Sequence, residues 1–224
     1  MIKTATVAFT HYASDGRVRR MAEALAERGD DVTAITLREE NEPKRYELAG
    51  VKVRTVNLKQ HRGSNQVLYL AQYVIFLLIA AWLLTVSHMG RRFNVVHINN
   101  MPDFMVFAAR PVKVLGAGVI LDIHDPMPEL FESKFGVGKG HMAVRAIGWV
   151  EQASIGFADE VISVHQIQLD TFMSRGADPS RFTIVQNVAD PKYFPIGMAL
   201  ESQRDTDAIQ LVYHGTMAPR LGLD

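Results

Sequence analysis

The chain has 224 residues, of which 48% are hydrophobic, enough to build the core of one large α/β domain. Its 24 basic and 24 acidic residues give a formal net charge of zero. It therefore lacks the basic excess with which proteins neutralise nucleic-acid phosphates, and we expect no nucleic-acid partner. It contains no cysteine, which excludes disulfides and thiolate metal sites. No long apolar run follows the first residues, so we expect no signal peptide.

The first part of the chain alternates between strand-like and helical patterns. Apolar runs predict strands over 5–9, 32–37 and 51–56. Between the first two strands, apolar residues with helical spacing indicate a helix, and Gly29 is a typical stop signal after it. These helical apolar residues are Val18, Met21, Ala22, Leu25 and Ala26.

The same alternation continues to residue 185. We predict further strands over 95–98, 119–123, 161–164 and 182–185. We predict helices over 67–86, 104–115, 144–157 and 167–174. This order is typical of a Rossmann-like doubly wound parallel sheet, in which ligands bind at the carboxyl ends of the strands.

The composition changes near Asp190, which suggests a domain boundary. Residues 1–188 are predicted to form the main domain, and the charged, proline-containing stretch 189–208 an interdomain linker. A new strand is predicted over 209–213. Because residues 209–224 are too few to form a domain, we interpret them as the start of a second one.

The loop after the first predicted strand places Gly16 and Arg17 at the N-terminus of a helix, where anions bind favourably. A dinucleotide fingerprint would need three glycines here, and the loop has one. The alternative is an ordinary strand–helix turn. After the strand over 95–98, Asn99 and Asn100 carry amides that suit sugar hydroxyls. The alternative there is a turn in which Asp103 caps the next helix.

The strand over 119–123 ends in a short polar segment. His124 and Asp125 follow the strand, and Glu129 comes after a loop that two prolines should stiffen. A histidine here can bind a sugar hydroxyl or orient a reacting group, and the two acids can bind or activate an acceptor hydroxyl. The alternatives are a helix capped by Asp125 beside a partly buried histidine, or, less favoured, a metal site of His11, His124 and Asp125.

Several short motifs occur along the chain in a specific order. They are DGRVRR (15–20) with LAERGDDV (25–32), VHINN (96–100), HDPMPE (124–129), ADEVISV (158–164) with VQNVAD (185–190), and the stretch from 213 to 224 with Gly215 and Arg220. Together they resemble the N-terminal, acceptor-side domain of family 4 retaining glycosyltransferases of the GT-B fold. The last stretch is similar to the entry into that family's nucleotide-sugar domain.

The resemblance implies roles for individual residues. His124 would face the donor sugar as a catalytic residue together with Asp125. Gly16, Arg17, Gly215 and Arg220 would lie at the donor diphosphate. Asn99, Asn100 and Glu129 would bind the acceptor. Because GT-B enzymes position the diphosphate with main-chain dipoles and basic side chains, we expect neither a metal nor a cofactor.

The resemblance also implies an activity. The protein would transfer a hexose, with retention, from a nucleotide-sugar to a glycan or lipid-linked acceptor, as in surface polysaccharide synthesis. The family's paired-glutamate motif does not occur before residue 224, so we expect the isolated chain to be inactive. The alternatives are an isomerase similar to nucleotide-sugar 2-epimerases and a non-catalytic, membrane-associated half-module.

The predicted helix over 67–86 contains no charged residue and is long enough to cross a bilayer. A crossing would separate the first three predicted strands from the others, so the sheet could not form. Two interpretations remain open. Either the helix is fully buried, or one face lies on a membrane with Tyr69, Tyr73 and Trp82 near the interface. The second would make the protein peripheral on the cytoplasmic face of a membrane, and the first simply cytoplasmic.

Overall fold

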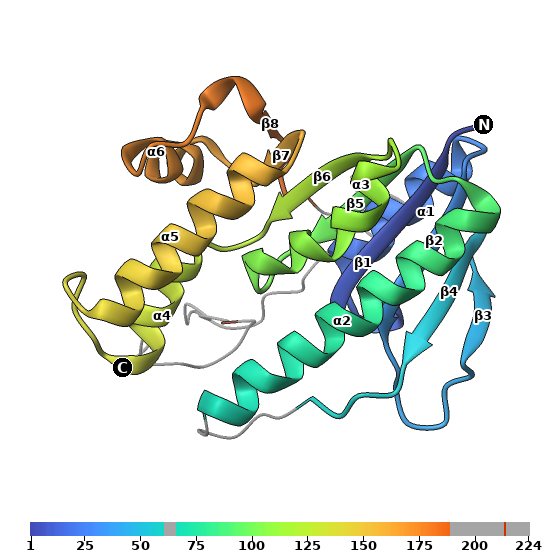
Figure 1. The fold of residues 1–224 in the computed structure, drawn as a ribbon, viewed down its shortest axis with the longest axis horizontal. Coiled ribbons are helices and arrows are strands. Elements are labelled where there is room, and N and C mark those ends of the chain that lie inside the picture. Colours follow the sequence, from blue (N-terminus) through green and yellow to red (C-terminus); the bar gives the residue numbers. More distant parts are fainter. Residues whose placement is uncertain (61–65, 189–212, 214–224) are drawn as a thin grey trace, which may run out of the picture.

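The computed structural model describes residues 1–60, 66–188 and 213. Its centre is a sheet of eight strands (Figure 1). In chain order these are β1 (Lys3–His11), β2 (Asp31–Leu37), β3 (Arg45–Leu48), β4 (Val51–Val56), β5 (Val95–Asn99), β6 (Gly118–Ile123), β7 (Glu160–Ser163) and β8 (Phe182–Ile184). The predicted strand over 209–213 and the predicted linker lie outside the described residues, apart from Tyr213.

The strand order is β3-β4-β2-β1-β5-β6-β7-β8, and every neighbouring pair is parallel except β3 with β4. Without the edge strand β3, the six strands from β4 to β7 have the order of a doubly wound Rossmann sheet. The chain starts at β1, builds outwards through β2 and β4, then returns to add β5 on the other side. The switch point therefore lies between β1 and β5, where this fold places its ligand crevice.

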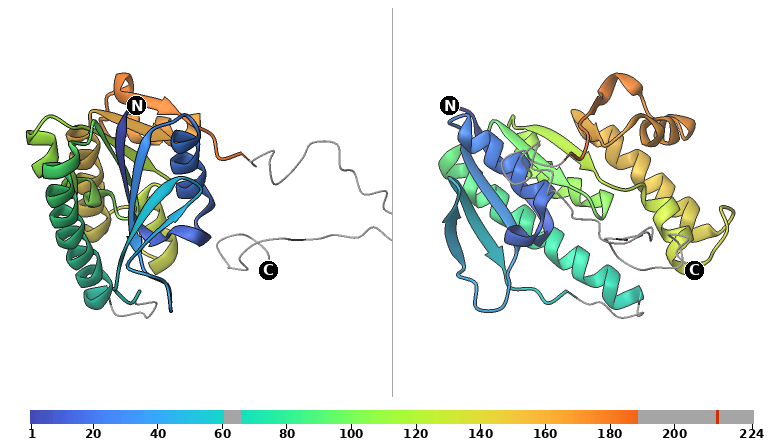
Figure 2. Two further views of the ribbon diagram at one scale, coloured as in Figure 1. Left: turned by 90° about the vertical axis from the view of Figure 1, so that its right-hand side faces the viewer. Right: turned by 180° about the vertical axis from the view of Figure 1, so that it is seen from behind.

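Helices cover both faces of the sheet. They are α1 (Gly16–Glu27), α2 (Gln66–Arg91), α3 (Arg110–Val114), α4 (Met127–Phe135), α5 (Met142–Phe157) and α6 (Gln166–Ser174). Three 3₁₀ segments accompany them, namely η1 (Tyr12–Ser14), η2 (Asp103–Ala109) and η3 (Pro179–Arg181). Figure 2 shows α2, α3 and α5 on one face and α1 on the other.

Each face of the sheet has its own apolar core. The larger core packs β1, β5 and β6 against α2, η2 and α5, with Phe76 and Met105 fully buried. The smaller one packs β2 and β4 against α1, with Val18 and Ala22 at its centre. The carboxylate of Asp15 accepts the Val18 N–H at 3.0 Å and so fixes where α1 begins.

Three local predictions were wrong. The segment 104–115 is not one helix but η2 followed by α3, because Pro111 has no N–H to donate to the preceding turn. The stretch from Asp125 to Glu129 is not a stiff loop. Pro128 lies in the first turn of α4, where its missing N–H costs nothing. The edge strand β3 was missed because its alternation of polar and apolar residues is short.

Candidate active site

Asp122, near the carboxyl end of β6, is the centre of a buried charged cluster. Nη2 of Arg17, from α1, lies 2.6 Å from Asp122 Oδ1, and its Nε lies 3.1 Å from Oδ2. The two side chains are 5% and 0% exposed. An arginine that donates to both carboxylate oxygens forms one of the strongest ion pairs, and here the pair ties α1 to the sheet.

Two histidines approach the same carboxylate. Nε2 of His97, on β5, lies 3.5 Å from Asp122 Oδ2, and Nε2 of His124, just after β6, lies 3.6 Å from it. Burial would raise the pKa of Asp122, but the neighbouring His124, His97 and Arg17 side chains outweigh burial and hold the pKa well below its usual range. Asp122 is therefore an anion at neutral pH.

His124 is the member of this cluster that solvent reaches. Its side chain is 23% exposed, while those of His97, Arg17 and Asp122 are at most 5% exposed. A carboxylate beside an imidazole orients the ring and favours the tautomer whose proton faces the carboxylate. The cluster can thus present an oriented imidazole to a ligand above the carboxyl end of β6.

The backbone of His124 is held from two sides. Its N–H donates to Oδ1 of Asn100 at 2.8 Å, and its carbonyl accepts from Nε2 of Gln168 at 3.1 Å. Gln168, in α6, also accepts from the Ser163 hydroxyl at 2.8 Å and from the Val164 N–H at 2.9 Å. The loop after β5 and the start of α6 therefore fix His124 relative to the sheet.

Asn99 and Asn100 are both buried. The two amide hydrogens of Asn100 go to Oδ1 of Asp103 at 2.8 Å and to the Asp125 carbonyl at 3.0 Å. Nδ2 of Asn99 donates to the Val7 carbonyl at 3.3 Å. Both amides therefore join parts of the chain to one another. Asp103 does not cap the following helix, and burial raises its pKa to about 7 despite the hydrogen bond from Asn100.

The first turn of α1 is open, although Arg17 is not. Gly16 is exposed, and a Cβ built on it would meet no heavy atom within 4 Å. Arg17 turns into the buried cluster, where its Nη1 donates to the Val185 carbonyl at 3.3 Å. Arg20, one turn later, donates to the Val188 carbonyl. A ligand can therefore approach Gly16, while Arg17 and Arg20 hold the segment after β8.

The two acids that follow His124 have different surroundings. Asp125 is exposed, and its carboxylate forms no hydrogen bond or ion pair with any described residue. Oε1 of Glu129 lies 2.6 Å from Nη1 of Arg175. Arg175 also donates through Nε and Nη2 to the buried carboxylate of Glu151, at 2.8 Å each. Of the two acids, Asp125 is the one left free to bind a ligand.

Two expected donor-binding residues are not described by the structure. Gly215 and Arg220 lie outside the described residues. Within the described ranges, which contain His11, His124 and Asp125, no three or more His, Asp or Glu side chains are grouped so as to hold a metal ion.

The sequence reasoning missed Asp122, His97 and Gln168 as site residues. Asp122 could have been found, because it is the single charge in an otherwise apolar strand and such a charge needs a partner. His97 gives the same signal more weakly. Nothing in the sequence pattern distinguishes Gln168 from other polar helix residues.

One face of α2 is exposed and apolar. Its segment Leu70–Arg91 is long and apolar enough to cross a membrane by length and composition. The mean hydropathy over 18 of its residues is 2.1, and 28% of that stretch is buried. The exposed side includes Leu78, Trp82 and Val86, with Trp82 68% exposed. Since α2 connects strands of one sheet, a crossing would break that sheet.

The interpretation of α2 as fully buried is therefore wrong. The expectation that Tyr73 lies at an interface is also wrong, because its ring packs against Phe9 at 4.6 Å between centroids and is buried. The side chain of Tyr69 lies outside the described part.

Comparison with solved structures identifies relatives of this architecture. Sucrose-phosphate synthase from Thermosynechococcus elongatus matches 86% of this chain with 15% identity and a TM-score of 0.60, and the match covers 49% of that protein. A glycosyltransferase from Rickettsia africae matches 87% with 15% identity and a TM-score of 0.53, over 45% of that protein. HepE from Anabaena, solved in complex with UDP-glucose, matches 86% with 12% identity and a TM-score of 0.51, over 45% of that protein.

The chain thus spans about half the length of these structures, which support the fold predicted above, the N-terminal half of a GT-B fold. Among curated proteins, none matches the sequence significantly. Residues 15–188 match one sequence family, the "Glycosyl transferase 4-like domain". The matched residues include α1, the Asp122 cluster and His124. The chain therefore belongs to the glycosyl transferase 4-like domain family, as its motifs predicted.

Proposed function

We propose that the chain is the acceptor-side half of a glycosyltransferase that uses a nucleotide-sugar donor. The observation that carries this proposal is His124, which is partly exposed above β6. Asn100 and Gln168 hold its backbone, and its ring lies beside Asp122. The open first turn of α1 at Gly16 suits a phosphate group, because helix N-termini favour anions. A relative of the same fold, HepE, has been solved with UDP-glucose, which supports this donor class.

In this proposal Nδ1 of His124 accepts a hydrogen bond from a hydroxyl of the donor hexose, because its Nε2 faces Asp122, and Asp125 accepts one from the acceptor. Asp122 orients the imidazole and stabilises positive charge on it. The sugar is transferred with retention, and the diphosphate is held by backbone dipoles and basic side chains without a metal. Gly215 and Arg220 contribute to that hold.

His124→Ala is expected to lower kcat for sugar transfer by about 100-fold, because a positioned general acid–base or hydrogen-bonding group contributes this much. The assay follows radiolabelled sugar from UDP-glucose, UDP-galactose or GDP-mannose into a lipid extract, using the full-length protein that contains this chain. His141→Asn is the matched control, because His141 is exposed, caps α5 and lies outside the cluster.

Unchanged transfer by His124→Ala would contradict the proposal. Epimerised nucleotide-sugar formed without an acceptor would indicate an isomerase instead. The 224-residue chain alone is expected not to transfer sugar, since the solved relatives are about twice as long. Normal turnover by this chain alone would contradict that expectation.

We further propose a lipid-linked acceptor, as used in polysaccharide synthesis, and peripheral attachment to the cytoplasmic face of a membrane. An apolar cavity of about 430 Å³ lies between the N-terminal part of α2, α4 and α5, lined by Leu70, Phe131 and Ile147 among others. It is next to the loop of Asn100 and Asp103 that holds His124. A hydrocarbon chain fits such a lining, and the exposed face of α2 offers a route from a membrane.

Trp82→Glu is expected to abolish flotation of the chain with phosphatidylcholine vesicles, because it places a charge in the exposed apolar face of α2. Circular dichroism should show an unchanged fold, since Trp82 is outside the core. Glu160→Gln, at an exposed position on β7, is the control and should float like the wild type. Unfolding of Trp82→Glu, or flotation like the wild type, would contradict the membrane contact.

A further inference from the structure

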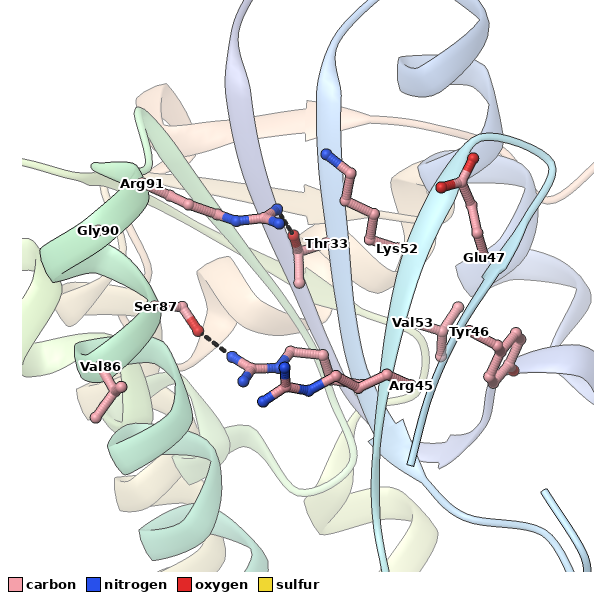
Figure 3. Close-up of a pocket in the computed structure, with 11 residues that line it drawn as sticks. Thr33, Arg45, Tyr46, Glu47, Lys52, Val53, Val86, Ser87, Gly90 and Arg91 are labelled. Carbon is pink, nitrogen blue, oxygen red and sulfur yellow. Dashed lines mark hydrogen bonds between the residues drawn. The ribbon is translucent and has the colours of Figure 1, made fainter. Parts of the chain in front are cut away.

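A second cavity, of about 510 Å³, lies at the C-terminal end of α2 (Figure 3), and none of its lining residues belongs to the His124 site. It is open to solvent and is lined by the last turns of α2 and by strands β2, β3 and β4. Four basic side chains line it, with one acidic one, Glu47. The basic residues are Arg45, Lys52, Arg54 and Arg91. None of them belongs to the site described above.

Two of these arginines face each other without a carboxylate between them. Arg45 on β3 and Arg54 on β4 are directly opposite in the antiparallel register. Like charges in this position normally destabilise a strand pair. Arg54 donates to the Ser87 hydroxyl of α2, and among the described residues no carboxylate lies within ion-pair distance of either guanidinium. Burial, and then the charges of Arg45 and Arg91, lower the pKa of Arg54.

The other two cations share a single carboxylate. Nζ of Lys52 lies 2.7 Å from Oδ1 of Asp31, and Nη1 of Arg91 lies 3.4 Å from the same oxygen. Nη1 of Arg91 also donates to the Thr33 hydroxyl at 2.9 Å. Glu47 forms no ion pair with a described residue. The cavity therefore keeps an excess of positive charge, which an anion would neutralise.

The apolar face of α2 leads into this cavity. Leu78, Trp82 and Val86 are spaced four residues apart, so they lie one above another on the same side of the helix, and all three are exposed. Val86 also lines the cavity, as does Gly90 one turn further on. An apolar stripe thus ends at a cluster of cations that carries an excess of positive charge.

We propose that this cavity binds the phosphate group of an anionic membrane lipid. The proposal rests on the membrane contact of α2 proposed above and adds a specific headgroup site to it. A helix whose apolar face lies at the headgroup and acyl boundary lies in the plane of the interface, so lipid phosphates are beside it along its length, including its C-terminal turns. Arg45 and Arg54 then supply two guanidinium groups whose geometry suits a phosphate.

The test compares flotation of the 224-residue chain with vesicles of phosphatidylcholine alone and with vesicles that also contain phosphatidylglycerol. The wild type is expected to bind the anionic vesicles at least about 10-fold more tightly, because each basic residue near an anionic surface contributes about 1 kcal/mol. Arg45→Gln/Arg54→Gln should lose this preference and still bind phosphatidylcholine. Circular dichroism checks that the variant folds.

The matched control is Arg19→Gln/Arg28→Gln, which removes the same charge at α1 on the opposite face of the sheet. It should keep the preference. Equal binding of both vesicles by the wild type, or a preference that survives in Arg45→Gln/Arg54→Gln, would overturn the headgroup site and leave the membrane contact intact. Binding to neither vesicle would overturn both. The wild type could also show no preference for anionic vesicles and yet bind inorganic phosphate more tightly than chloride at equal ionic strength. That result would indicate a site for free phosphate instead.

Discussion

Asp122→Asn is expected to lower the free energy of unfolding by about 3–5 kcal/mol. The substitution keeps the size of the side chain and removes its charge. Arg17, 5% exposed and paired with both oxygens of Asp122, would then be a buried cation without a counter-ion. The measurement is urea unfolding of wild type and variant at pH 7, followed by circular dichroism.

Two controls separate charge from packing. In Arg17→Met/Asp122→Leu both charges are replaced by apolar groups of similar size, and this double variant should be more stable than Asp122→Asn. Asp178→Asn weakens an exposed pair with Arg181 and should cost far less stability than Asp122→Asn, because asparagine can still cap the segment η3. Asp122→Asn with wild-type stability would show that the pair adds nothing to folding.

The same cluster has a defined pH response. Because the folded pKa of Asp122 is depressed, its contribution is present above the unfolded pKa of about 3.9 and is lost as the pH falls below it. The part of the stability difference between wild type and Asp122→Asn that comes from the Arg17–Asp122 pair should therefore be constant between pH 5 and 8. It should shrink only in stronger acid.

The doubly wound parallel sheet was predictable because buried parallel strands are short apolar runs that alternate with helices. The partners within the site were not. Arg17 and Asp122 are 105 positions apart, and no local pattern joins them. Arg17 was placed at the donor phosphates from its position at a helix N-terminus, and the structure turns its side chain into the sheet instead. Whether the Arg17 side chain points to the ligand side or into the sheet depends on Asp122, which is its neighbour only in the folded structure.

The exposure of α2 shows the same limit. Its sequence is apolar on every side, so its composition cannot say which side meets the sheet. The structure answers through packing, with Phe76, Ala80 and Leu84 buried and Leu78 and Trp82 exposed. The cationic cavity could not be predicted from the sequence either. Strand β3 is too short to be predicted, and only its pairing with β4 brings Arg45 opposite Arg54.

Arg175→Met is expected to lower the free energy of unfolding by about 3–5 kcal/mol at pH 8. Methionine keeps the apolar stem but leaves the carboxylate of Glu151, which is completely buried, without its two hydrogen bonds from the guanidinium. Glu129 loses the same partner but is partly exposed, so Glu129→Gln should change stability far less. Urea unfolding measures all three proteins.

The stability lost in Arg175→Met should depend on pH between 5 and 8, unlike the loss of the Arg17–Asp122 pair in Asp122→Asn. Burial already raises the pKa of Glu151 although Arg175 opposes it, and removal of Arg175 raises the pKa further. A folded pKa above the unfolded value of about 4.3 means that the folded state binds the extra proton, so stability falls as the pH rises through this window. Arg175→Met should therefore recover part of its lost stability at pH 5. An uncompensated carboxylate in the core must take up a proton as the pH falls. If Arg175→Met instead loses the same stability at pH 5 and at pH 8, then Glu151 stays ionised or gains water, and the prediction is wrong.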